Sequence, residues 1–110
     1  MADLTESLIR SLRPEGQAAA IYLINAARQA GVPVVVVETR RTLQRQRALL
    51  ASGASRTLHS AHLLGRAFDV GFVGHHPDAV PLPVYSWLHD LWLQLGGRPM
   101  ISWDRVHFEW

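Results

Sequence analysis

The sequence contains no cysteine and no lysine, and it has no long apolar run. Without cysteine the chain can form neither disulfides nor thiolate metal sites, and it has no cysteine nucleophile. Any metal ion would therefore be held by histidine and carboxylate side chains. The longest stretch without a charged residue lies between Glu15 and Arg28, which is too short to cross a bilayer. We therefore expect no membrane insertion.

The amino-terminal segment carries charges where a secretory signal peptide would need an apolar run, at Asp3, Glu6, Arg10 and Arg13. We therefore expect synthesis in the cytoplasm without a signal peptide. The length of 110 residues predicts a single domain over residues 1–110. Hydrophobic residues make up 48% of the chain and charged residues 18%, a balance that excludes intrinsic disorder.

Every basic residue is an arginine, and the formal net charge is only +2. Six arginines fall in a stretch that contains no Asp or Glu: Arg40, Arg41, Arg45, Arg47, Arg56 and Arg66. Such a segment attracts an anionic partner, which can be nucleic acid phosphate or a polymer that carries carboxylates. The alternative is that these arginines form solvated helix faces.

Local patterns predict four helices and a small sheet. Helices are expected over residues 2–12, 14–30, 42–52 and from a cap at Ser86 to Gly96. Strands are expected over residues 34–37 and 66–73, with a strand or hairpin over 101–110, whereas 54–65 and 74–83 are predicted loops. The fold class is therefore α+β, with a small, mainly antiparallel sheet flanked by helices.

Two of the predicted strands share one design. In the first, Phe68, Val70 and Phe72 point to one face while Asp69 points to the other among small neighbours. In the second, Val106, Phe108 and Trp110 share a face, and Arg105, His107 and Glu109 share the opposite one. If the two strands are adjacent, Asp69 and His107 can converge.

His62 lies seven residues before Asp69, with Gly65 between them to allow a tight turn into the strand. Two histidines and one aspartate, with a fourth position left to water, have the composition of a catalytic zinc site. The remaining histidines, His59, His75, His76 and His89, are expected in loops or at the surface. Of these, only His59 is near enough in sequence to support the site.

The order and spacing of these residues match a known pattern. Residues 60–69 fit S-x-H-x-x-G-x-A-x-D at each fixed position, and Asp104 and His107 then supply D-x-x-H followed by Phe108. The motif resembles that of the zinc peptidases of the D-alanyl-D-alanine carboxypeptidase and L-alanyl-D-glutamate endopeptidase family, which includes phage endolysins. Arg41 and Gln46 also match the family's Tyr-Arg-Ser turn and following helix, although Arg40 and Thr42 replace the tyrosine and the serine.

The resemblance implies a hedgehog/DD-peptidase-like fold and one Zn²⁺ held by His62, Asp69 and His107. It implies that Asp104 is the catalytic acid and base, which requires a turn or bulge before the last strand, because residues three apart on a strand face opposite ways. Arg41 would stabilise the tetrahedral intermediate or hold a substrate carboxylate. Supporting or substrate-binding roles are expected for Ser60, Gln46, Trp103 and Glu109.

The implied function is zinc-dependent hydrolysis of the peptidoglycan stem peptide by a monomer that acts on the cell wall after its release. An L-alanyl-D-glutamate endopeptidase is the first choice, and a D,D- or L,D-carboxypeptidase the second. Stem peptides carry free carboxylates, which would provide the arginines with a partner other than nucleic acid. Two other classes stay open: a zinc-binding module without turnover, and a nucleic-acid-binding protein whose arginines share one outward face.

Overall fold

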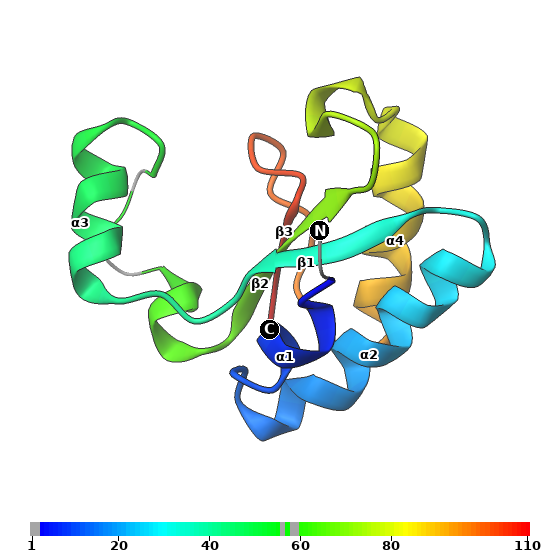
Figure 1. Ribbon diagram of the computed structural model, residues 1–110, viewed down its shortest axis with the longest axis horizontal. Helices are drawn as coiled ribbons and strands as arrows, with labels where there is room; N and C mark the ends of the chain where they lie inside the picture. The colour runs from blue at the N-terminus through cyan, green and yellow to red at the C-terminus, as the bar shows by residue number, and fades with distance from the viewer. Residues whose placement is uncertain (1–2, 56, 58–59) are drawn as a thin grey trace.

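An antiparallel sheet in the order β1-β2-β3 lies at the centre of the computed structural model, which describes residues 3–55, 57 and 60–110 (Figure 1). Its strands are β1 (Val34–Glu38), β2 (Ala67–Phe72) and β3 (His107–Glu109). The helices are α1 (Thr5–Ile9), α2 (Pro14–Gln29), α3 (Leu43–Ala51) and α4 (Leu82–Gln94), with short 3-10 helices η1 (Ala61–Leu64) and η2 (Pro77–Ala79). The predicted α+β class is confirmed.

Local sequence signals explain where several helices begin. Thr42 precedes α3, and its side chain accepts a hydrogen bond from the Arg45 amide, as a helix N-cap should. The predicted start of the last helix at Ser86 was wrong, because α4 already begins at Leu82. Pro83 stands in its first turn, where the missing proline N–H has no helical acceptor to lose. The first helix is also shorter than predicted.

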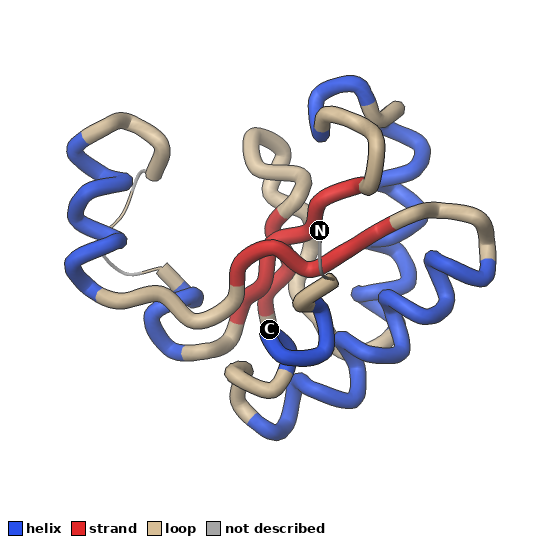
Figure 2. Tube along the Cα trace, in the orientation of Figure 1, coloured by secondary structure: helices blue, strands red, loops and turns tan. Residues whose placement is uncertain are grey.

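One face of the sheet packs on the hydrophobic core. Phe68 of β2 is fully buried, with its ring perpendicular to Trp92 at 5.2 Å and stacked on Phe108 at 5.3 Å between centroids. Phe72 meets Tyr85 of α4 edge to face at 5.5 Å. Helices α2 and α4 lie together on one side of the strands, whereas α3 stands on the other (Figure 2). The predicted apolar face is therefore confirmed.

The opposite face of the sheet carries a row of polar side chains. Asp69 at the centre of β2 pairs with His107 on β3 and with Glu38 on β1. A bulge between Val36 and Glu38 produces this alignment. Because side chains alternate along a strand, Glu38 would otherwise share the core-facing side of Val36, and the extra residue turns it to the polar face.

A membrane span requires a helix of sufficient length and apolar character. Within the described ranges, no helix combines the length and the apolar character of a membrane span.

His89 lies in the core, so its predicted place at the surface was wrong. Its ring stacks on Phe108 with centroids 4.0 Å apart and planes 4° apart, and only 3% of the residue is exposed. Nε2 lies 2.7 Å from the carbonyl oxygen of Arg105, to which it donates in the neutral ring. Its neighbours in α4 include the buried Leu88 and Trp92, so the helix turns this position inward. His75 and His76 are exposed, as expected.

The burial of His89 makes folding stability depend on pH. Burial lowers the pKa of His89, so below the ordinary value of about 6.5 the unfolded chain takes up a proton that the folded chain resists. The stability that the neutral, buried His89 contributes to the folded state is therefore present above pH 6.5 and is lost as pH falls. The raised pKa of His107 acts in the opposite direction, so the prediction concerns the difference between two proteins: between pH 7 and pH 5 the wild type should lose more free energy of unfolding, or gain less, than His89→Phe. Urea titrations at each pH measure this, with His75→Gln as control; equal pH slopes in the two proteins would contradict it.

Candidate metal centre

Three predicted ligands meet on the polar face of the sheet. Nε2 of His62 lies 3.1 Å from Oδ1 of Asp69 and 3.1 Å from Nδ1 of His107. Nδ1 of His107 lies 3.3 Å from the same Asp69 oxygen. The two histidines are buried and Asp69 is partly buried. The structure therefore joins residues 45 positions apart in the chain into one cluster.

The short helix η1 places His62. The Ser60 side chain accepts a hydrogen bond from the His62 amide, and Gly65 ends the helix in a left-handed conformation with φ of 68°. Such a conformation suits glycine because it has no Cβ. Nδ1 of His62 lies 2.6 Å from the carbonyl oxygen of Thr39, at the end of β1. This bond assigns the proton to Nδ1 and leaves the lone pair of Nε2 directed at the cluster.

His107 is oriented by a carboxylate in a similar way. Nε2 of His107 lies 3.4 Å from Oε1 of Glu109, two residues further along β3 on the same face. With the proton on Nε2, Nδ1 turns its lone pair to the cluster. Metal-bound histidines commonly have such a partner on the second ring nitrogen, because it sets the tautomer and the ring orientation.

The donor set fits a divalent cation. When both imidazoles are neutral, two nitrogen lone pairs and a carboxylate oxygen face one another, which a positive charge must offset. Tetrahedral zinc with bonds of 2.0–2.1 Å holds its ligand atoms about 3.3 Å apart, close to the 3.1–3.3 Å separations of this cluster. His62, Asp69 and His107 can therefore hold a metal with a fourth position free for water.

The pKa values of Asp69 and His107 also indicate that the metal-free site favours positive charge. Burial alone would raise the pKa of Asp69, but hydrogen bonds from His107 and His62, which require a proton on the ring nitrogens that face the cluster, lower it to about 2. Burial opposes protonation of His107, whereas the Asp69 carboxylate raises the pKa of this imidazole. The site thus favours positive charge beside an ionised Asp69, and a metal ion would compete with protons for it.

Glu109 provides a measurable test of this orientation. We expect Glu109→Gln to weaken zinc binding about 10- to 100-fold, because the weaker partner leaves the His107 ring less well oriented and less basic. Competition with a chromophoric chelator would measure the dissociation constant. Glu6→Gln, at an exposed site on α1, is the control. Equal zinc affinity in Glu109→Gln and the wild type would contradict the assigned partner.

Asp104 lies in a turn just before β3, so the turn expected here is present. Its amide donates to the Ile101 carbonyl at 2.9 Å, and its own carbonyl accepts from the His107 amide at 3.1 Å. Oδ2 of Asp104 is 4.0 Å from Nδ1 of His107. Burial, followed by the nearby Asp69 carboxylate, raises the pKa of Asp104. The Asp104 carboxyl group thus lies beside the three candidate metal ligands but is farther from them than they are from one another.

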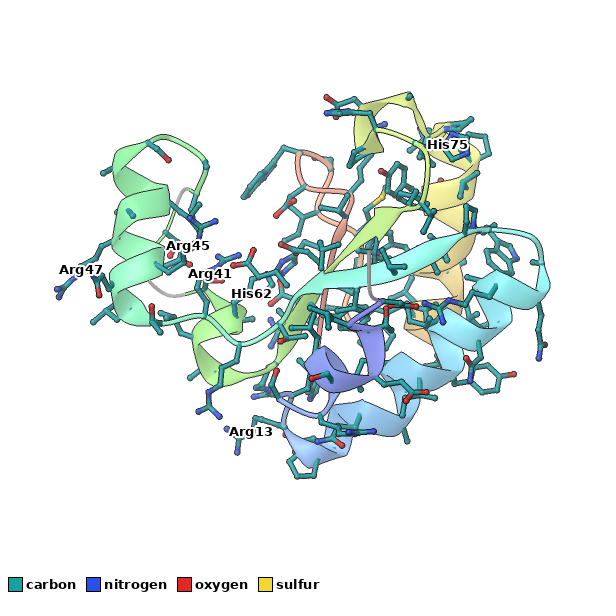
Figure 3. All side chains as sticks on the ribbon, in the orientation of Figure 1. Arg13, Arg41, Arg45, Arg47, His62 and His75 are labelled. Carbon is teal, nitrogen blue, oxygen red and sulfur yellow. The ribbon has the colours of Figure 1, made fainter. Side chains whose placement is uncertain are left out.

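Arg41 lies near His62 (Figure 3). Its side chain is only 8% exposed; Nε donates to Glu38 at 2.9 Å and Nη1 to Gln46 at 2.6 Å. The remaining group, Nη2, is 3.8 Å from Oδ2 of Asp69. Two bonds therefore hold the guanidinium so that its third nitrogen faces the site.

Gln46 joins this arginine to the segment that follows α3. The amide oxygen of Gln46 accepts from Arg41, and its Nε2 donates to Ser55 Oγ at 2.7 Å and to the Thr57 carbonyl at 2.6 Å. Gln46 is completely buried. Gln46 therefore holds the Arg41 side chain in place and does not face solvent.

A pocket of about 260 Å³ opens beside the cluster. Its walls include Asp104, Arg41 and Trp103, together with Ser60, Ala54, Ser55 and Thr57. Trp103 is 52% exposed, so its indole forms part of a surface and not of the core. All three ligands line this pocket, and a bound molecule can reach them from solvent.

Sequence reasoning missed Glu38 and Thr39 at the end of β1. Glu38 holds Arg41, and the Thr39 carbonyl holds His62. A backbone carbonyl has no sequence signal, and the position of Glu38 depends on the β1 bulge. The prediction for His59 lies outside the described residues.

Comparisons with known proteins find similar peptidases. An L-alanyl-D-glutamate peptidase from Listeria phage A118 is 39% identical over 61 residues, which are 56% of this chain and 22% of the relative. The chain thus spans about a fifth of the length of that curated relative. No protein-family model matches.

Solved structures cover almost the whole chain. The L-Ala D-Glu endopeptidase ChiX of Serratia marcescens has a TM-score of 0.64 and 25% identity, over 99% of this chain and 87% of its own. VanYB in complex with D-alanine-D-alanine has a TM-score of 0.66 and 19% identity, over 90% and 71%. A VanY D,D-pentapeptidase in complex with Zn(II) has a TM-score of 0.63 and 19% identity, over 90% and 72%. In its motif and its fold, the chain is similar to the peptidases of the D-alanyl-D-alanine carboxypeptidase and L-alanyl-D-glutamate endopeptidase family.

Proposed function

We propose that this chain is a zinc-dependent peptidase that cleaves the L-alanyl-D-glutamate bond of the peptidoglycan stem peptide. The observation that carries the proposal is the convergence of His62, Asp69 and His107 in an open pocket that Asp104 and Arg41 also line. The named activities of the phage relative and of ChiX support this choice of bond.

The residues divide the chemistry between them. Zn²⁺ held by the three ligands supplies Lewis acidity, which lowers the pKa of water and polarises a carbonyl. Asp104 accepts the proton of the attacking water and returns it to the leaving amine; its position 4.0 Å from a ligand nitrogen and its raised pKa suit both tasks. A carboxylate with an ordinary pKa would be a weaker base in the first transfer.

Arg41 stabilises negative charge beside the ligands. Glu38 and Gln46 fix its Nε and Nη1, so Nη2 is held in place before a substrate arrives. Preorganised donors stabilise an oxyanion without reorganising during the reaction, which is their advantage over solvent. Trp103 provides an exposed ring along the same pocket against which a peptide can pack.

Digestion of purified peptidoglycan tests the bond. The zinc-loaded protein should release fragments whose new amino termini are D-glutamate, as read by mass spectrometry, and chelation should stop the reaction. Release of free D-alanine instead would identify the carboxypeptidase alternative. Absence of any zinc-dependent cleavage would overturn the proposal and favour a zinc-binding module without turnover.

The arrangement of arginines favours a carboxylate-bearing partner over nucleic acid. Arg41 is buried in the site, and Arg45 and Arg47 leave α3 in different directions (Figure 3), as expected for residues about 200° apart on a helix. These three arginines therefore do not form a shared basic face for phosphate binding.

We further propose that residues 1–110 form one catalytic domain, which is made in the cytoplasm and acts as a monomer on the cell wall after release. Gel shifts at low salt should show no nucleic acid binding.

A further inference from the structure

His89 of α4 reaches from the core to the segment that carries two of the site residues. Its Nε2 lies 2.7 Å from the carbonyl oxygen of Arg105, the residue after Asp104. Its ring stacks on Phe108, the residue after His107, at 4.0 Å between centroids. One buried side chain therefore contacts the chain immediately after Asp104 and immediately after His107.

The segment needs such support because little regular structure holds it. Strand β3 begins only at His107, and Asp104 lies in the turn before it. Two consecutive carbonyls of this turn are bound from different elements: Val106 accepts from the Val70 amide of β2 at 3.0 Å, and Arg105 accepts from His89 of α4. The side chain of Arg105 is exposed, so its backbone provides the contact with the core.

Core packing alone does not account for an imidazole at this position. Nδ1 of His89 is buried and has no hydrogen-bond partner among the described residues. An unpaired buried nitrogen is unfavourable, and a phenyl ring would stack on Phe108 without it. What the imidazole offers and phenylalanine does not is the Nε2 donor to the Arg105 carbonyl.

We propose that His89 is a positioning residue, which holds the 104–107 turn so that the Asp104 carboxylate stays beside the ligands. This inference rests on the proposed function, because it assigns His89 a part in that reaction. The residue does not line the pocket around the ligands, so it acts through the Arg105 carbonyl and touches no substrate.

Two substitutions separate the donor from the ring. His89→Phe retains a ring that can stack on Phe108 and removes the donor, whereas His89→Gln retains an N–H at a similar reach and removes the ring. We expect His89→Phe to lower kcat about 10- to 100-fold with little change in KM, since small misplacements of a catalytic group have effects of this size. His89→Gln should recover most of the loss. His75→Gln is the control for an exposed histidine.

Amide hydrogen exchange provides a readout that does not depend on turnover. In the zinc-loaded protein, the His107 amide, which donates to the Asp104 carbonyl, should exchange faster in His89→Phe than in the wild type or in His89→Gln. Thermal melts would show that both variants fold. Unchanged exchange and kcat in His89→Phe, or an equal loss in both variants, would overturn the proposal. If the wild type hydrolyses no stem peptide, the proposed function fails, and exchange still decides whether His89 orders the turn.

Discussion

Asp104→Asn is expected to lower kcat for stem-peptide hydrolysis about 10²- to 10⁴-fold, the usual contribution of general acid–base catalysis. The amide preserves the shape of the side chain but can neither accept the water's proton nor return it to the leaving amine. Zinc should stay bound, because Asp104 is 4.0 Å from the nearest ligand nitrogen. Turnover of a stem-peptide substrate and metal content, measured on the same preparations, would show this separation.

Asp90→Asn is the matched control for that experiment. Asp90 is an exposed aspartate on α4 and does not line the pocket, so its substitution should leave kcat unchanged. If Asp104→Asn hydrolysed the substrate as fast as the wild type, Asp104 could not be the acid and base. Glu109, the other carboxylate that the pocket offers next to His107, would then be the next candidate.

His62→Ala is expected to reduce bound zinc from about one ion per chain to none and to remove hydrolysis entirely. Two protein ligands would remain, fewer than the three that catalytic zinc sites use. The loss also orphans the Thr39 carbonyl, which now accepts from His62. Metal analysis after dialysis measures the stoichiometry, and His75→Ala provides the control.

Thermal melts extend this test to folding. Zinc bound to the folded wild type should raise its Tm in proportion to the logarithm of free zinc, whereas His62→Ala should show no such rise. Retention of one tightly bound ion by His62→Ala would contradict the ligand assignment. Asp69→Ala should behave in the same way, because its Oδ1 lies within 3.3 Å of both ligand nitrogens.

Several features of the site needed the tertiary structure. The partner of Nδ1 of His62 is the backbone of Thr39, 23 residues away, and no side-chain pattern encodes a carbonyl acceptor. His89 was expected at the surface because a polar residue in a helix carries no sign of which partner it meets. Its actual partners, Arg105 and Phe108, come from the far end of the chain.

The sequence by itself determined the alternation of the two strands, and with it the polar face that Asp69 and His107 share. It also determined the start of the third predicted helix near Thr42 and the motif spacing, since these depend on neighbours a few residues apart. Only the tertiary structure decided that a β1 bulge turns Glu38 towards Arg41 and that α4 supports the turn of Asp104. Those outcomes depend on contacts between distant segments, whose free energies no local pattern contains.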